Sequence, residues 1–172
     1  KKVARLAERM AATPVRNFWI SIDSSDPDLH GQMRGFDNLF EGIAKALPIF
    51  EVAGIYPSVN LGINRNLGGA ATRDLSREDY SSDREWEKAV YQTYRKAFAA
   101  FYETVIDLGF TIANACYPMS VDENSTSLDP VYQASAVDRV IRFTRTEKKQ
   151  IFRALFDTIP EYRSRIRIFS PR

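Results

Sequence analysis

The stretch FWISIDSSDPDLHGQMRGFDNLFEGIAKALPIFEVAGIYPSVNLGI, residues 18–63, decides the fold class. It opens with a short aromatic and β-branched run, 18–23, which predicts a buried strand. The polar segment 24–37 predicts a loop. Apolar residues at helical spacing then predict a helix over 39–50, and residues 56–63 predict a second strand. The stretch therefore has the order strand, helix, strand.

The same alternation continues through the rest of the chain. Residues 2–12 and 86–108 carry apolar side chains at the 3.6-residue period of amphipathic helices. Residues 110–117 and 165–169 predict two further strands. The helix-to-strand junctions resemble each other and place a glycine at the expected helix C-terminus: Ala53-Gly54-Ile55 and Leu108-Gly109-Phe110. Repeated helix-to-strand junctions of this kind are typical of an α/β architecture.

Caps and prolines indicate where the later helices begin and end. Thr144 and Glu147 have the spacing of a capping box, which predicts a helix start. Pro160 is expected to end that helix, and Pro48 is expected to kink the earlier one.

We therefore expect an α/β fold with parallel strands, built as a partial (β/α) TIM-like barrel. An open sheet with the same four strands also fits the pattern. Residues 1–172 are expected to form a single domain, with polar insertions at 64–85 and 121–136. In either architecture, ligands bind at the carboxyl ends of the strands.

The composition indicates which class of protein this is and in which cellular compartment it is expected. The chain is 44% hydrophobic and 27% charged, as soluble globular proteins are. No stretch approaches the roughly 20 apolar residues of a membrane helix, and the first ten residues are too charged for a signal peptide. We expect no membrane partner. The single cysteine, Cys116, excludes an internal disulfide and favours a cytoplasmic location.

The C-terminal segment 139–172 is basic, with ten Lys and Arg residues against three acids. Such a segment can attract an anionic partner, although a solvated helix face gives the same pattern. Phe143 and Phe152 fall at core spacing rather than on a stacking platform, so we expect no nucleic-acid partner.

Polar residues mark the carboxyl ends of the expected strands. Ser21 and Asp23 are two residues apart on a strand and therefore face the same way. Asn60 and Asn64 belong to the second strand and its end. His30 follows the first strand, where a lone histidine is most often a surface or packing residue. The sequence contains no glycine-rich phosphate loop, HExxH motif or paired-cysteine metal motif.

Residues 21–43, SIDSSDPDLHGQMRGFDNLFEGI, resemble the fourth strand and following loop of radical S-adenosylmethionine (SAM) enzymes. In that family Ser-(Ile/Leu)-Asp is followed by a His, by Arg-Gly and by a helix that opens on Phe. The matching positions here are Ser21, Ile22, Asp23, His30, Arg34, Gly35 and Phe40. Asn60 and the run 109–119 are similar to the next two strands of the family. The resemblance covers residues 1–120, and 121–172 share only the alternation of elements.

The resemblance implies that one set of residues binds SAM: Ser21, Asp23, Arg34, Asn60, Tyr117 and Met119. Arg34 is expected to pair with the SAM carboxylate, because a guanidinium can contact it through two hydrogen bonds. Ser21 is expected near the ribose or amino group, with Asp23 close by. Asn60 is expected at a ribose hydroxyl, and Tyr117 to Met119 beside the adenine.

The resemblance also implies a [4Fe–4S] cluster that, with SAM, generates a 5′-deoxyadenosyl radical in an oxidoreductase or modifying enzyme of unknown substrate. This chain lacks the family's CxxxCxxC motif and therefore provides no metal ligand. We expect the cluster ligands and the rest of the barrel upstream, with this chain as the later part of a radical SAM barrel. A degenerate member without a cluster is the other possibility.

Two alternatives remain open. A non-radical (β/α)-barrel isomerase or aldolase-type enzyme could use Asp23 and His30 as acid and base. An anion-binding module could instead use the basic segment 139–172.

Overall fold

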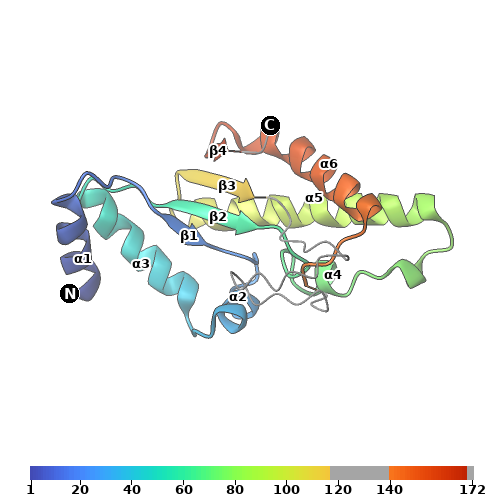
Figure 1. Cartoon of the computed structure of the whole chain (residues 1–172), viewed down its shortest axis with the longest axis horizontal. Helices are drawn as coiled ribbons and strands as arrows, with labels where there is room; N and C mark the ends of the chain where they lie inside the picture. The colour runs from blue at the N-terminus through green and yellow to red at the C-terminus, as the bar shows by residue number, and fades with distance from the viewer. Residues whose placement is uncertain (117–139, 170–172) are drawn as a thin grey trace, which may run out of the picture.

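The computed structural model describes residues 1–116 and 140–169, and it has an α/β fold around a four-stranded sheet (Figure 1). The strands are β1 (Trp19–Ser21), β2 (Ser58–Gly62), β3 (Ile112–Cys116) and β4 (Arg167–Phe169). Each strand pairs in parallel with the next one along the chain, so their order in the sheet is β1-β2-β3-β4. The predicted α/β class and parallel strands are confirmed.

Helices connect the strands. They are α1 (Lys2–Ala11), α2 (Pro27–Arg34), α3 (Leu39–Val52), α4 (Ala70–Arg73), the 3₁₀ helix η1 (Arg77–Asp79), α5 (Asp83–Asp107) and α6 (Arg145–Tyr162). Figure 1 shows the long helix α5 running alongside the sheet with α6 beside it, and these two helices pack together extensively. Helix α1 packs on α3 at the other end of the molecule.

One face of the sheet forms the hydrophobic core. Alternate strand residues, including Val59, Leu61, Ala113 and Ala115, are buried in one cluster with apolar residues of α3, α5 and α6. The side chains that alternate with them belong to the other face. Helices α3, α5 and α6 therefore share one side of the sheet.

The predicted loop 24–37 is wrong, because it contains α2. The side chain of Asp26 accepts hydrogen bonds from the backbone N–H groups of Asp28 and Leu29, both at 3.0 Å, and Pro27 occupies the first helical position. An acidic N-cap followed by proline is a strong helix start. The sequence predicts a loop here because most residues of the segment are polar.

The prediction that Pro160 ends its helix is also wrong, since α6 continues to Tyr162. A proline removes the hydrogen bond to the carbonyl four residues earlier, which here belongs to the exposed residue Phe156. Water can satisfy that carbonyl. Helix α3 likewise contains Pro48 and runs on to Val52. The capping box of Thr144 and Glu147 is confirmed.

The insertion 64–85 carries the short elements α4 and η1 before α5 begins. The insertion 121–136 lies outside the described residues. In the described ranges 1–116 and 140–169, no helix is both long enough and apolar enough to cross a membrane.

Candidate functional site

Three polar side chains form a row across the sheet on the face opposite the core. The strand register pairs Ser21 with Asn60 and Asn60 with Asn114. The Nδ2 group of Asn114 donates a hydrogen bond of 2.8 Å to Oδ1 of Asn60. All three residues are partly exposed. The structure therefore brings the predicted residues Ser21 and Asn60 onto neighbouring strands and adds Asn114 to them.

Asp23 and Arg34 meet just beyond the carboxyl end of β1. The Arg34 guanidinium lies 2.5 Å from the Asp23 carboxylate, and their side chains are 40% and 13% exposed, respectively. The carboxylate is thus shielded while the guanidinium stays open to solvent on one side. A guanidinium carries five N–H donors, so its exposed side can bind a second carboxylate while Asp23 keeps the other side.

The glycine after Arg34 explains why the arginine stands at this place. Gly35 has φ = 71°, a left-handed conformation that glycine adopts without steric cost. The backbone N–H groups of Gly35 and Phe36 then bond back to the carbonyls of Gln32 and Gly31. This Schellman-type ending stops α2 at Arg34, so the Arg-Gly pair fixes the arginine in the last turn of the helix.

The peptide groups of Asp23 are held on both sides. Its N–H donates to Nδ1 of His30 at 3.3 Å, and its carbonyl accepts from Nδ2 of Asn64 at 2.8 Å. Asn64 also donates to the carbonyl of Gly62 at 2.8 Å, and its Oδ1 accepts from the N–H of Asn66 at 2.7 Å. The chain segments that follow β1 and β2 are therefore tied together through Asp23 and Asn64.

His30 is buried completely and packs against Phe40, with ring centroids 5.4 Å apart. Burial lowers the pKa of His30 below 6.5; Asp23 opposes this shift, and Arg34 adds to it. Its Nε2 atom is buried without a hydrogen-bond partner among the described residues. The expectation of a packing residue is confirmed, but the bond to Asp23 is an additional role.

Asn66 is a site residue that sequence reasoning missed. It is buried, its Nδ2 lies 3.4 Å from the sulfur of Met33, and its Oδ1 has no partner among the described residues. A buried amide at the end of a parallel strand needs partners or a ligand. The available signal was an Asn-x-Asn pattern directly after a strand.

The remaining expected site residues, Tyr117 and Met119, lie outside the described residues. Within residues 1–116 and 140–169, no three His, Cys, Asp or Glu side chains gather as a metal site. The described part of the chain does not fit an iron–sulfur cluster, which needs several cysteine thiolates.

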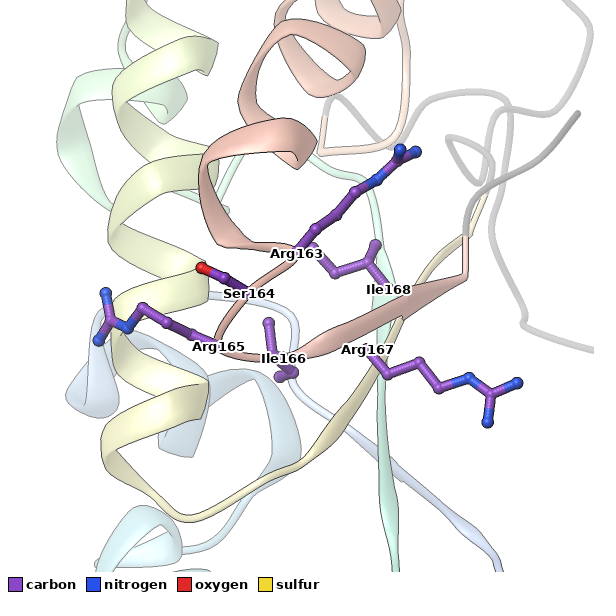
Figure 2. Close-up of a pocket in the computed structure, with 6 residues that line it drawn as sticks. All are labelled: Arg163, Ser164, Arg165, Ile166, Arg167 and Ile168. Carbon is purple, nitrogen blue, oxygen red and sulfur yellow. The ribbon is translucent and has the colours of Figure 1, made fainter.

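The basic C-terminal segment does not focus its charges on one point. Arg163, Arg165 and Arg167 line a shallow cavity, and Figure 2 shows their guanidinium groups pointing away from one another. Arg165 already donates two hydrogen bonds to the carboxylate of Glu103, at 2.7 and 2.9 Å. Arg163 and Arg165 precede β4, and Arg167 is its first residue and pairs with Ile112 of β3.

No protein-family model matches the sequence, and the search of curated proteins also finds no match.

Proposed function

We propose that this chain is the SAM-binding part of a radical SAM enzyme and binds SAM on the polar face of the sheet. One observation carries the proposal: the Ser21–Asn60–Asn114 row lies opposite the helices, next to the Asp23–Arg34 pair at the carboxyl end of β1. A ligand on this face would meet amide, hydroxyl and guanidinium groups without opening the core.

The sheet topology supports a barrel segment rather than a doubly wound sheet. The strands follow one another in chain order, and α3, α5 and α6 pack on the same face. In a (β/α) barrel the helices lie on the outer face, whereas a doubly wound sheet has helices on both faces. In this proposal the polar row faces the barrel interior, where barrel enzymes bind their ligands.

Each group has a chemical match in SAM. Arg34, held on one side by Asp23, would bind the carboxylate of the methionine part through charge-assisted hydrogen bonds from its exposed side. The amides of Asn60 and Asn114 offer both donors and acceptors to ribose hydroxyls. Ser21, at the edge of the row, would contact the ribose or amino group.

The [4Fe–4S] cluster of the family requires ligands from outside this chain, because the described residues do not form a cluster site. We propose that these ligands belong to a CxxxCxxC motif encoded upstream of Lys1, roughly 80 to 100 residues before Ser21, the length of about three βα units. The upstream reading frame tests this part. If the reading frame contains no CxxxCxxC motif there, radical chemistry is excluded, but SAM binding by this chain remains to be tested.

Direct titration tests SAM binding. We would titrate the 172-residue chain with SAM, S-adenosylhomocysteine and adenosine by isothermal calorimetry. The two carboxylate-bearing compounds should bind more tightly than adenosine. Arg34→Ala should weaken both by about 10- to 100-fold, the worth of a hydrogen bond to a charged group. Arg163→Ala, in the turn between α6 and β4, is the matched control and should change nothing. Equal binding by wild type and Arg34→Ala would overturn the assignment.

The isomerase or aldolase alternative receives less support. It requires His30 to reach a substrate, but the imidazole is fully buried and its Nδ1 is bonded to the Asp23 amide. The Asp23 carboxylate is already engaged in an ion pair with Arg34.

A further inference from the structure

His30 connects the buried side of α2 to the ion pair at the end of β1. Its Nδ1 accepts the N–H of Asp23, whose carboxylate contacts Arg34 four residues after His30 on the same helix. A single residue, Asp23, therefore contacts His30 through its backbone and Arg34 through its side chain. Any movement of the imidazole would move the carboxylate that holds the guanidinium.

The hydrogen bond defines the protonation state of the ring. Because Nδ1 is an acceptor, the proton of the neutral imidazole must be on Nε2. That N–H is buried without a partner among the described residues. A second proton on Nδ1 would point at the Asp23 N–H, so the protonated ring cannot keep this contact.

We propose that neutral His30 is a positioning residue that holds Asp23 and Arg34 in their binding geometry, and that protonation of His30 releases them. Its consequence for SAM rests on the proposed function. The structural part rests only on the contacts among His30, Asp23 and Arg34.

The surroundings of the ring favour the neutral form. The charged groups that act on His30 are the Asp23 carboxylate beyond β1 and the Arg34 guanidinium on α2, and they oppose each other. From α3, the ring meets the apolar side chain of Phe40. The segment after β2 reaches Asp23 through the amide of Asn64, which does not titrate.

The chain has one histidine, so NMR can follow this ring without assignment ambiguity. The imidazole should show the Nε2-protonated tautomer and a pKa below 6.5. Arg34→Ala should raise this pKa, because it removes a nearby positive charge, and Asp23→Asn should lower it. An Nδ1-protonated tautomer, or a pKa that neither variant moves, would overturn the proposal.

Two substitutions separate the hydrogen bond from the packing of the ring. His30→Phe keeps the ring against Phe40 but removes the acceptor, so hydrogen exchange of the Asp23 amide should become at least about tenfold faster. His30→Asn loses the ring but keeps an acceptor at nearly the same place, and should protect this amide as wild type does. Equal protection in His30→Phe and wild type would contradict the proposal without any ligand.

The effect on ligand binding is tested by measuring the affinity for SAM between pH 8 and pH 5. Wild-type affinity should fall as the pH drops through the measured pKa of His30, and His30→Asn should lack this step. If SAM fails to bind the wild type at any pH, the proposed function fails, while the exchange experiment still decides the positioning role. A wild-type step that persists in His30→Asn would refute the pH coupling.

Discussion

The carboxylate of Asp23 and the guanidinium of Arg34 lie 2.5 Å apart and join the carboxyl end of β1 to the last turn of α2. The acid is the more buried partner, since its side chain is 13% exposed against 40% for the arginine. This asymmetry means that the two partners are not equivalent in mutagenesis. Removing the arginine leaves a shielded carboxylate without its cation, whereas removing the acid leaves a cation that water can still reach.

The first prediction concerns this pair. Arg34→Ala should lower the free energy of unfolding by about 1–2 kcal/mol, between the values for exposed and for fully buried pairs, and Asp23→Asn should cost less. Urea unfolding at pH 7 measures both. Arg73→Ala breaks an ion pair with Asp74 on the exposed surface and should leave stability unchanged. A larger loss in Asp23→Asn than in Arg34→Ala would contradict the asymmetry.

A second prediction tests whether α5 is the centre of the core. Phe101 is fully buried, whereas Phe156 on α6 is 45% exposed and stacks on Phe152. Phe101→Ala should cost about 3–5 kcal/mol, because a cavity replaces the ring, and Phe156→Ala should cost less than about 1 kcal/mol. Thermal and urea unfolding of this pair measure the difference. Similar losses in the two variants would contradict the central place of α5 in the core.

Much of this core could be predicted from the sequence, because the apolar residues that recur at helical spacing along α5 and α6 are also the buried ones. Trp86, Val90, Phe98, Phe101 and Val105 repeat at helical spacing and are all buried. Periodicity detects such long amphipathic helices well. It fails for α2, where only His30 and Gly31 are buried, so the helix carries almost no apolar stripe.

The site could be predicted only in part for a related reason. Ser21 and Asn60 follow from strand alternation, and Asp23 and Arg34 were grouped through the resemblance of residues 21–43. Asn114 and Asn66 are placed by strand register and by the return of the chain after β2, which depend on pairing between distant segments. Local pattern contains no information on such register.

A third prediction follows from the lowered pKa of His30. Above pH 6.5 the ring is neutral in both the folded and the unfolded chain. Below that pH the unfolded chain binds a proton that the folded chain resists, so stability should fall until the folded pKa is reached. Urea unfolding at pH 7.5 and 5.5 measures this loss. His30→Asn removes the histidine term, so its stability should change less between these pH values. An equal change in both proteins would show that carboxylates account for all of it.

A fourth prediction concerns the start of α6. The Glu147 carboxylate is buried, caps the helix at Thr144 and contacts Arg65 at 2.7 Å. Glu147→Ala should cost about 3 kcal/mol, because it removes the cap and leaves the shielded Arg65 guanidinium without its carboxylate, with only the Arg142 carbonyl as acceptor. Thr144→Ala removes only half of the box and should cost about 1 kcal/mol. Unfolding by urea distinguishes these values, and equal losses would assign no role to Arg65.

The fifth prediction compares Gly→Ala changes at a helix position with free space and at a turn position without it. Gly42 is exposed within α3, and an added Cβ meets no atom within 4 Å, so Gly42→Ala should stabilise the protein by about 0.5–1 kcal/mol. At Gly68 the added Cβ would lie 2.8 Å from Cβ of Ala97 on α5. Neither a helix backbone nor its alanine methyl can move aside easily, so Gly68→Ala should cost about 1–3 kcal/mol.

The Gly68 change has a second expected effect, because the segment after β2 carries Asn64 and Asn66. Pushing this segment away from α5 should weaken the bond from Asn64 to the Asp23 carbonyl. Hydrogen exchange of the Asp23 amide should then be faster in Gly68→Ala than in Gly42→Ala, when each variant is measured at the same interval below its own midpoint of urea unfolding. Faster exchange limited to the residues near Ala97 would mean that the strain stays local. Faster exchange that reaches Asp23 would show that close packing of this loop on α5 holds the site together.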